Sequence, residues 1–353
     1  MEHETRWRRD CILKMIEDEK IKKICVRMPN WIGDVVMALP ALKSISLHFP
    51  SAELIVATNL NCSDIFRYID FYITQLLVLE KHKIFNNSKI LRTHSFDAII
   101  LFTNSFSSAL ESKLSNIGHR FGYTKDCRGF LLSEKYHPEE QTKKLHHRFY
   151  YSALTKKFFG FDNDSDIPKL RKVSIPPNIL EKNGWEQGRP AIGINPGAAY
   201  GSAKRWLPER FAETAEHFLN KKYQVIVFSG KGSEADNANR VAQKMKNVIN
   251  LSGKTTLSEL IESISFCDLF LTNDSGPMHI ASALGIPLTA IFGPTDAVST
   301  SPSGGIYNIV TTNEPCSPCM KRECPLKHHN CMKNISSTMV IDALEELERN
   351  IRK

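Results

Sequence analysis

The residues with the clearest chemical potential lie at 273–285, where the sequence is Asn-Asp-Ser-Gly-Pro-Met-His-Ile-Ala-Ser-Ala-Leu-Gly. An apolar run at 267–272 with the length of a buried strand precedes them, and the alanine-rich continuation predicts a helix. The first-turn N–H groups and the positive end of the helix dipole favour an anion such as a pyrophosphate. The stretch therefore predicts a nucleotide-diphosphate site, with an ordinary helix cap by Asp274 or Ser275 as the alternative.

A second loop, at 195–206, follows another predicted strand at 191–195. Its small residues permit close backbone approach to a ligand, and Lys204 and Arg205 put positive charge beside a phosphate. The alternative is a lysine that is simply solvated. Because both loops follow strands of one domain, they fit a diphosphate better together than either does alone.

Two carboxylates occupy corresponding positions after predicted strands. Asp34 lies where a first strand at 24–28 turns into a helix at 35–47, so it is either a helix cap or a general base that takes a proton from a hydroxyl. Glu234 follows a strand at 224–229 and either accepts hydrogen bonds from ribose hydroxyls or favours the helix dipole.

Cysteines and basic residues form two further clusters. Cys316 and Cys319 have the Cys-x2-Cys spacing of a zinc site, and Cys324, Cys331, His328 and His329 follow. The alternatives are a bound metal and a compact loop of reduced thiols. The basic cluster at 143–148, which includes His147 and Arg148, is either a solvated face or an acceptor contact. No Walker loop is present, and no Gly-x-Gly-x-x-Gly follows the first strand.

Composition narrows the classes of protein. The chain has 353 residues, 42% of them apolar and 24% charged, which is typical of a globular protein with two domains. No apolar run approaches the roughly 18–20 residues of a membrane span, and no signal peptide is evident, so we expect a cytoplasmic protein. Its nine cysteines are an odd number, which favours reduced thiols over disulfides. The net charge of +8 favours an anionic partner.

The expected elements alternate between short apolar strands and helices, which predicts parallel sheets. Residues 1–20 form an N-terminal extension with helical spacing of apolar residues, which packs on the protein or lies on a membrane surface. We expect one Rossmann-like domain at 21–165, a proline-containing linker at 166–190 and a second such domain at 191–336. A final helix at 337–353 closes the chain.

Several of these motifs occur together in one family. They are Asn30-Trp31-Ile32-Gly33-Asp34, Asn195-Pro196-Gly197-Ala198 with Ala203-Lys204-Arg205-Trp206, Asn273-Asp274-Ser275-Gly276-Pro277-Met278-His279, and Phe292-Gly293-Pro294-Thr295. With them, the sequence from residue 21 onward resembles the ADP-heptose:lipopolysaccharide heptosyltransferases of glycosyltransferase family 9. Cys316-Ser317-Pro318-Cys319 also occurs in the type II subgroup, which the sequence resembles most.

The resemblance implies a GT-B fold, in which two Rossmann-like α/β domains face each other across a cleft and the C-terminal helix returns to the first domain. It implies an inverting transfer of heptose from ADP-heptose to the first heptose of the lipopolysaccharide inner core. No cofactor or metal is expected, so zinc is only an alternative for Cys316, Cys319, Cys324 and Cys331. The lipid A–core acceptor implies peripheral contact with the cytoplasmic face of the inner membrane.

The resemblance also implies roles for individual residues. Asp34 would be the catalytic base, and Lys204 would neutralise the leaving pyrophosphate. The residues expected to bind the donor are Asn195, Gly197, Ala198, Lys204, Glu234, Asp274, Ser275, Gly276, Pro277, Met278 and His279. The residues expected to bind the acceptor are Asn30, Trp31, His147 and Arg148.

Other functions share some of these features. Another family 9 transferase, of type I or type III, would differ only in its core position or donor, because motifs do not fix specificity. A nucleotide-sugar epimerase would act without a lipid acceptor. A zinc-dependent module that binds nucleic acid or a protein partner would use the cysteines and the net charge of +8. Because the basic residues are scattered and no aromatic platform accompanies them, we expect no nucleic acid partner.

Overall fold

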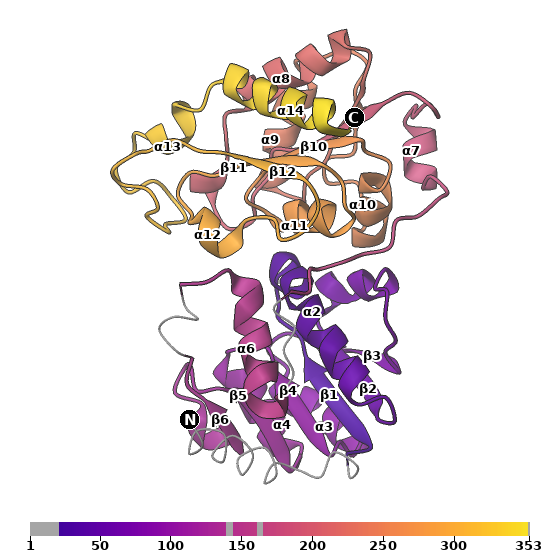
Figure 1. The fold of residues 1–353 in the computed structure, drawn as a ribbon, viewed down its shortest axis with the longest axis vertical. Helices are drawn as coiled ribbons and strands as arrows, with labels where there is room; N and C mark the ends of the chain where they lie inside the picture. The colour runs from indigo at the N-terminus through magenta and orange to yellow at the C-terminus, as the bar shows by residue number, and fades with distance from the viewer. Residues whose placement is uncertain (1–20, 139–143, 161–164, 352–353) are drawn as a thin grey trace. The chain divides into compact units, whose positions relative to one another are not determined.

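The computed structural model describes residues 21–138, 144–160 and 165–351, and the predicted helix at 1–20 lies outside these ranges. The chain divides into two compact units, residues 1–167 and 168–353 (Figure 1). Each unit is built around a six-stranded sheet in which every pair of neighbouring strands is parallel. The predicted α/β class is therefore confirmed. No helix in the described part of the chain is long and apolar enough to cross a membrane.

The sheet of the first unit has the strand order β3-β2-β1-β4-β5-β6. Its strands are β1 (Lys23–Arg27), β2 (Glu53–Thr58), β3 (Gln75–Val78), β4 (Ala98–Leu101), β5 (His119–Tyr123) and β6 (Glu134–Tyr136). Strand β1 coincides with the strand predicted at 24–28. Strands β5 and β6 have no apolar run that would predict them, because the sequences HRFGY and EKY contain charged residues and too few consecutive apolar ones.

Helices cover both faces of this first sheet. They are α2 (Ile32–His48), α3 (Ile84–Thr93), α4 (Phe106–Leu114) and α6 (His147–Phe159), with short 3-10 turns η2 (Leu60–Arg67) and η3 (Gly129–Leu131). Helix α2 packs on α6, and α3 packs on α4. The order of the strands reverses direction at β1, so the loop from β1 into α2 lies at the position where such sheets bind ligands.

The sheet of the second unit has the order β12-β11-β10-β7-β8-β9. Its strands are β7 (Ala191–Asn195), β8 (Gln224–Val227), β9 (Ile249–Asn250), β10 (Leu269–Asn273), β11 (Leu288–Ile291) and β12 (Tyr307–Val310). Strand β12 was not predicted from the sequence. It lies at the edge of the sheet with an exposed Tyr307 and a buried Val310, so it has no continuous apolar run.

The helices of the second unit flank this sheet. They are α7 (Asn178–Lys182), α8 (Pro208–Asn220), α9 (Ser233–Ala242), α10 (Leu257–Ile264), α11 (Gly276–Ala283), α12 (Ala297–Thr300), α13 (Asn330–Lys333) and α14 (Ser337–Ile351), with a 3-10 turn η4 (Ser202–Lys204). Pro208 starts α8 at a position where a missing N–H costs nothing, and Thr256 and Glu259 form a capping box at α10.

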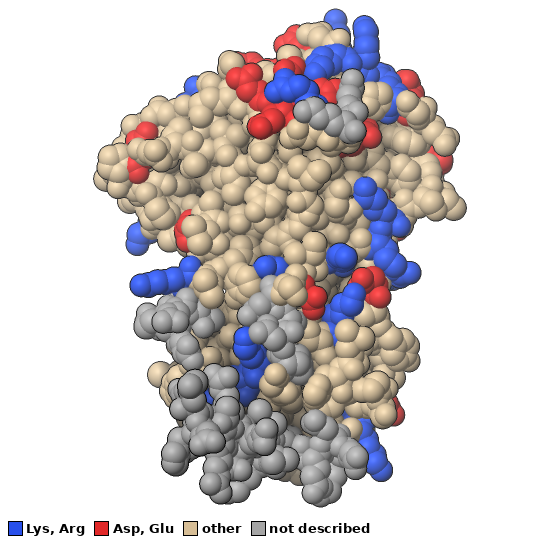
Figure 2. Space-filling model, viewed as in Figure 1, with Lys and Arg blue, Asp and Glu red and all other residues tan. Residues whose placement is uncertain are grey.

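The C-terminal helix α14 packs on the second unit. Its buried residues Val340, Leu344 and Leu347 belong to the core of the second unit, where α14 packs on α8 and β10–β12 (Figure 1). Lys221, the C-cap residue of α8, donates from Nζ to Glu345 of α14 at 3.2 Å. Figure 2 shows acidic and basic side chains mixed at this end of the unit. The helix thus buries its apolar face in the core of the second unit.

The expected linker at 166–190 belongs largely to the second unit. The Leu170 N–H donates to the carbonyl of Ala283 at 2.8 Å, Leu180 of α7 is fully buried, and the Trp185 ring packs edge-on against Phe266 at 5.3 Å. These contacts attach the proline-containing segment to the second unit, which therefore begins at Pro168.

Candidate active site

The polar residues of the second unit gather where β7 and β10 end. The two strands are neighbours, and Thr272 pairs with Asn195 across them. This is also the point at which the strand order of the sheet reverses, where open α/β sheets bind ligands. The loop after β7, residues 196–206, is called the donor loop below.

Two buried asparagines hold the donor loop in place. Asn273 donates from Nδ2 to the carbonyl of Pro196 at 2.9 Å and accepts the Trp206 N–H at 3.1 Å. Asn195 donates to Ser275 Oγ at 3.1 Å. The Trp206 indole is fully buried and donates to the carbonyl of Ile335 at 3.0 Å. Both ends of the donor loop are thus fixed by hydrogen bonds to distant parts of the unit.

Lys204 and Asp274 form an ion pair at this edge of the sheet. Lys204 Nζ lies 2.5 Å from Asp274 Oδ2, and the two side chains are only 12% and 5% exposed. Thr295 Oγ1 also donates to Asp274 Oδ2, at 2.7 Å. The alternative of a solvated lysine is therefore wrong. The carboxylate holds the ammonium group in place where the donor loop meets β10.

Helix α11 begins directly after this ion pair. Ser275 occupies its N-cap position, but no side chain makes a capping hydrogen bond there. The alternative of a plain cap by Asp274 or Ser275 is therefore wrong, since Asp274 binds Lys204 and Ser275 binds Asn195. An uncapped helix start of this kind leaves N–H groups available to an anion.

Four of the residues expected to bind the donor lie in α11 and offer little side-chain surface to a ligand. Met278 is fully buried and His279 is 5% exposed, so both side chains pack within the unit. Gly276 and Pro277 form the first turn of α11. These four residues can approach a ligand mainly through their backbone.

Glu234, in the first turn of α9, lies between two glycines. A Cβ atom at Gly197 would lie 2.7 Å from Glu234 Oε2, and one at Gly230 would lie 3.0 Å from Oε1. Burial raises the pKa of the Glu234 carboxyl, and the Arg205 charge partly opposes that shift. The glycines thus provide room for a partly desolvated carboxylate beside the donor loop, where Ala198 is also buried and accepts from Arg205 at 3.4 Å.

Asp34 lies in the first turn of α2, at the carboxyl edge of the first sheet. The N-cap residue is Trp31, whose side chain makes no capping hydrogen bond, and Asp34 follows it in the first turn. Asp34 is partly buried. Burial and, after it, the Asp34 charge raise the pKa of the Tyr151 phenol, which places the carboxylate within electrostatic range of that ring.

The predicted acceptor residues are distributed over the first unit. Asn30 accepts a hydrogen bond from Asn59 Nδ2 at 3.1 Å through its carbonyl, and the Trp31 ring is 57% exposed. His147 begins α6, and Arg148 Nη1 donates to the carbonyl of Asp166 at 2.7 Å. Their roles stay predictions.

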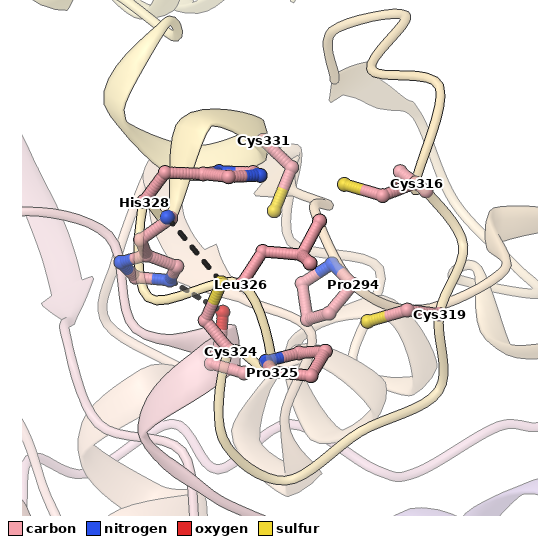
Figure 3. A pocket seen from close by; sticks show the side chains of 11 residues that line it. Pro294, Cys316, Cys319, Cys324, Pro325, Leu326, His328 and Cys331 are labelled. Atoms are coloured by element: carbon pink, nitrogen blue, oxygen red, sulfur yellow. Dashed lines mark hydrogen bonds between the residues drawn. The ribbon is translucent and has the colours of Figure 1, made fainter.

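The four cysteines of the C-terminal stretch line one small pocket with His328 and His329 (Figure 3). Leu326 and Pro294 lie between the thiols, and burial, followed by the other three cysteines, raises the pKa of Cys331 to about 11. Among the residues that the structure describes, no three histidine, cysteine or acidic side chains are arranged to hold one metal ion. None of these four cysteines forms a disulfide in this structure.

Tyr200, Thr295 and Arg322 lie near the ion pair, and none of them had a predicted role. The Tyr200 ring lies 4.8 Å from Lys204 Nζ and 5.2 Å from the Arg322 guanidinium carbon. Tyr200 belongs to a motif-bearing loop, but nothing in the sequence connects it to Arg322. Thr295, by contrast, belongs to the Phe-Gly-Pro-Thr motif quoted above. That motif could have indicated a role for Thr295, but none was assigned to it.

Comparison with known proteins identifies relatives over most of the chain. Residues 84–330 match the family described as glycosyltransferase family 9 (heptosyltransferase). The lipooligosaccharide heptosyltransferase 2 of Campylobacter jejuni is 34% identical over 92% of this chain and 99% of its own length. The lipopolysaccharide heptosyltransferase 2 of Escherichia coli is 28% identical over 92% of this chain and 98% of its own.

A solved structure has the same fold. The ADP-heptose lipopolysaccharide heptosyltransferase II of Escherichia coli superposes with a TM-score of 0.81 and 25% identity, covering 94% of this chain and all of that one. The two six-stranded parallel sheets and this match confirm the predicted GT-B fold class.

Proposed function

The chain belongs to glycosyltransferase family 9, the heptosyltransferase family, and from that premise we propose that it transfers heptose from ADP-heptose to the first heptose of the lipopolysaccharide inner core. Its relatives of 27–34% identity over most of the chain carry the name heptosyltransferase 2, which supports the type II role. The protein is a glycosyltransferase, and the epimerase alternative has weaker support.

The observation that carries this proposal is the ion pair Lys204–Asp274 beside the uncapped start of α11. Breaking a sugar–diphosphate bond develops negative charge on phosphate oxygens. A fixed ammonium group and oriented N–H groups stabilise that charge without having to reorganise. We assign the diphosphate of the donor to this edge of the second unit.

The remainder of the donor would extend from this point along the donor loop. Glu234, partly desolvated between Gly197 and Gly230, is suited to accept hydrogen bonds from ribose hydroxyls. Asn195 and Asn273 act indirectly, because they fix the backbone that the donor would contact.

The reaction we propose is a single displacement. Asp34 takes the proton from an acceptor hydroxyl, and that oxygen attacks the anomeric carbon of the heptose. The bond from this carbon to the diphosphate oxygen breaks as the new bond forms, which inverts the anomeric configuration and releases ADP. Lys204 and the α11 N-terminus take up the charge of the leaving group, so the proposal needs no cofactor.

The acceptor in this proposal is the lipid A–core molecule, so the protein would work at the cytoplasmic face of the inner membrane. The net charge of +8 suits an anionic acceptor and membrane surface. In the first unit, Asn30 and the exposed Trp31 adjoin Asp34 in sequence, and His147 and Arg148 begin α6. We propose these four residues as acceptor contacts.

The experiment measures ADP release from ADP-heptose with three additions: no acceptor, a core without heptose, and a core with one heptose. The proposal expects release only with the mono-heptosylated core. Release that needs only the core without heptose would assign the protein to type I transfer. Conversion of ADP-heptose without any acceptor would favour the epimerase.

A further inference from the structure

The segment at 314–331, called the cysteine loop below, packs against the donor loop. The Ala203 N–H donates to the carbonyl of Arg322 at 3.0 Å, and the Tyr200 hydroxyl donates to the carbonyl of Met320 at 3.1 Å. A hydrogen bond of 2.8 Å joins His329 Nε2 to the carbonyl of Ala203. The cysteine loop thus forms one wall around the segment that carries Lys204.

The contact at Gly201 shows how closely the two loops approach. A Cβ atom at this position would lie 2.2 Å from the carbonyl oxygen of Arg322. Only glycine fits such an approach without displacing backbone, so the backbone of Arg322 is held in a defined place beside the donor loop.

The side chain of Arg322 extends from this anchored backbone to the Tyr200 ring. Its guanidinium carbon lies 5.2 Å from the ring centroid, and Lys204 Nζ lies 4.8 Å from the same centroid. One aromatic ring therefore orients two cations near the ion pair, through the attraction of cations to its electron-rich face.

The charges around the donor loop differ in how they are compensated. Lys204 is paired with Asp274, and the charge of Arg205 acts on the buried Glu234. Arg322 makes no ion pair with an acidic residue in the described part of the chain, and its side chain is exposed. Of these three cations, Arg322 is the most exposed and therefore the most accessible to an added anion, and its sequence neighbour Glu323 is exposed as well.

We propose that Arg322 is a second cation for the diphosphate of the donor, delivered to the site by the cysteine loop and oriented by Tyr200. A nucleoside diphosphate brings more negative charge than the single Lys204 can balance, since Asp274 already offsets that lysine. The planar guanidinium donates two parallel hydrogen bonds to phosphate oxygens, which an ammonium group does not. This proposal rests on the proposed function.

The test compares the affinities of ADP and AMP, measured by calorimetry, for the wild type and three variants. Arg322→Gln removes the charge and retains a polar side chain, and Arg322→Lys retains a point charge. Lys321→Gln is the matched control, because it removes the positive charge of the adjacent exposed residue and leaves Arg322 beside the Tyr200 ring. In all three variants the backbone carbonyl of residue 322 can still bind Ala203.

We expect Arg322→Gln to weaken ADP binding by about 10-fold or more and AMP binding by less than about 3-fold, because charge-assisted hydrogen bonds to the second phosphate are lost. Arg322→Lys should fall between Arg322→Gln and the wild type. Lys321→Gln should leave the ratio of the two affinities unchanged.

An unchanged ADP-to-AMP affinity ratio in Arg322→Gln would overturn the proposal, as would an equal effect of Lys321→Gln. Equal weakening of both nucleotides would also overturn it, because that result indicates a structural effect on the whole site. Failure of the wild type to bind ADP at all would contradict the proposed function, and this inference would fall with it.

Discussion

Replacing Asp274 by asparagine isolates the charge of the Lys204–Asp274 pair. The amide has nearly the volume of the carboxylate and keeps an oxygen that can accept from Thr295. The variant therefore leaves the ammonium group of Lys204 in place with its negative partner removed. Since the two side chains are 12% and 5% exposed, water compensates little of that loss.

The magnitude follows from the burial of the pair. Removing one partner of a buried ion pair costs about 3–5 kcal/mol, because the other charge stays desolvated. The Tyr200 ring attracts Lys204 in the wild type and in the variant, so the lysine keeps one favourable contact and we take the lower end of this range. We therefore expect Asp274→Asn to lower the free energy of unfolding of the second unit by about 3 kcal/mol.

Urea unfolding followed by tryptophan fluorescence measures this loss, with and without saturating ADP. If the diphosphate binds at Lys204, it supplies the missing negative charge, so the variant should bind ADP more tightly than the wild type. Each tenfold gain in ADP affinity reduces the difference in unfolding free energy between wild type and variant, called the stability gap below, by about 1.4 kcal/mol. We expect the gap to narrow by at least that amount at equal ADP.

A surface ion pair provides the control. Lys23 and Glu53 lie 3.0 Å apart with 28% and 56% of their side chains exposed, so Glu53→Gln should cost less than about 1 kcal/mol and be insensitive to ADP. Wild-type stability of Asp274→Asn without ADP would refute the argument from burial. A large gap that ADP leaves unchanged would refute the assignment of the diphosphate to Lys204.

Three further predictions concern single positions. Asp34→Asn should lower turnover by about 100-fold or more while ADP affinity stays unchanged in calorimetry, and turnover within tenfold of the wild type would contradict its role as the base. Glu234→Gln should stabilise the fold at neutral pH, because burial raises the carboxyl pKa and ionised Glu234 therefore opposes folding. That gain in unfolding free energy should disappear when the pH falls below the unfolded-state pKa of about 4.3. Unfolding curves measured at several pH values test this, and a gain that stays constant with pH would contradict the reasoning. Gly201→Ala should cost about 1–3 kcal/mol by forcing the Arg322 carbonyl away, whereas Gly118→Ala, with nothing within 4 Å of its new Cβ, should leave the melting temperature unchanged.

The sequence predicted the strands that precede the candidate site residues. Apolar runs identified β1, β7 and β10, and the polar residues that follow them could be assigned to the carboxyl edges of two sheets. Asp34, Lys204 and Asp274 were found because each lies directly after such a strand or in the loop that leaves it.

The contacts between residues of different loops could not be predicted from the sequence. Lys204 and Asp274 are 70 positions apart, and their contact depends on β7 and β10 being neighbours in the sheet. Tyr200 and Arg322 meet only because the cysteine loop folds back on the donor loop. No periodicity or spacing encodes such contacts, which follow from tertiary packing.

The surface that covers the last helix could not be predicted from its own sequence, for a related reason. The apolar spacing of Val340, Leu344 and Leu347 predicts a helix with one buried face, but it does not identify the surface that covers this face. In the structure these residues lie in the core of the second unit beside α8 and β10–β12, and the return of the helix to the first domain stays a prediction.

The central claim is that this chain adds one heptose to a core that already carries one. Mass spectrometry of the acceptor after incubation with the purified protein and ADP-heptose tests it directly. The account predicts that the mono-heptosylated core gains the mass of one heptose and that Asp34→Asn does not produce this gain. An unchanged mono-heptosylated core, or heptose added only to the core that carries none, would contradict it.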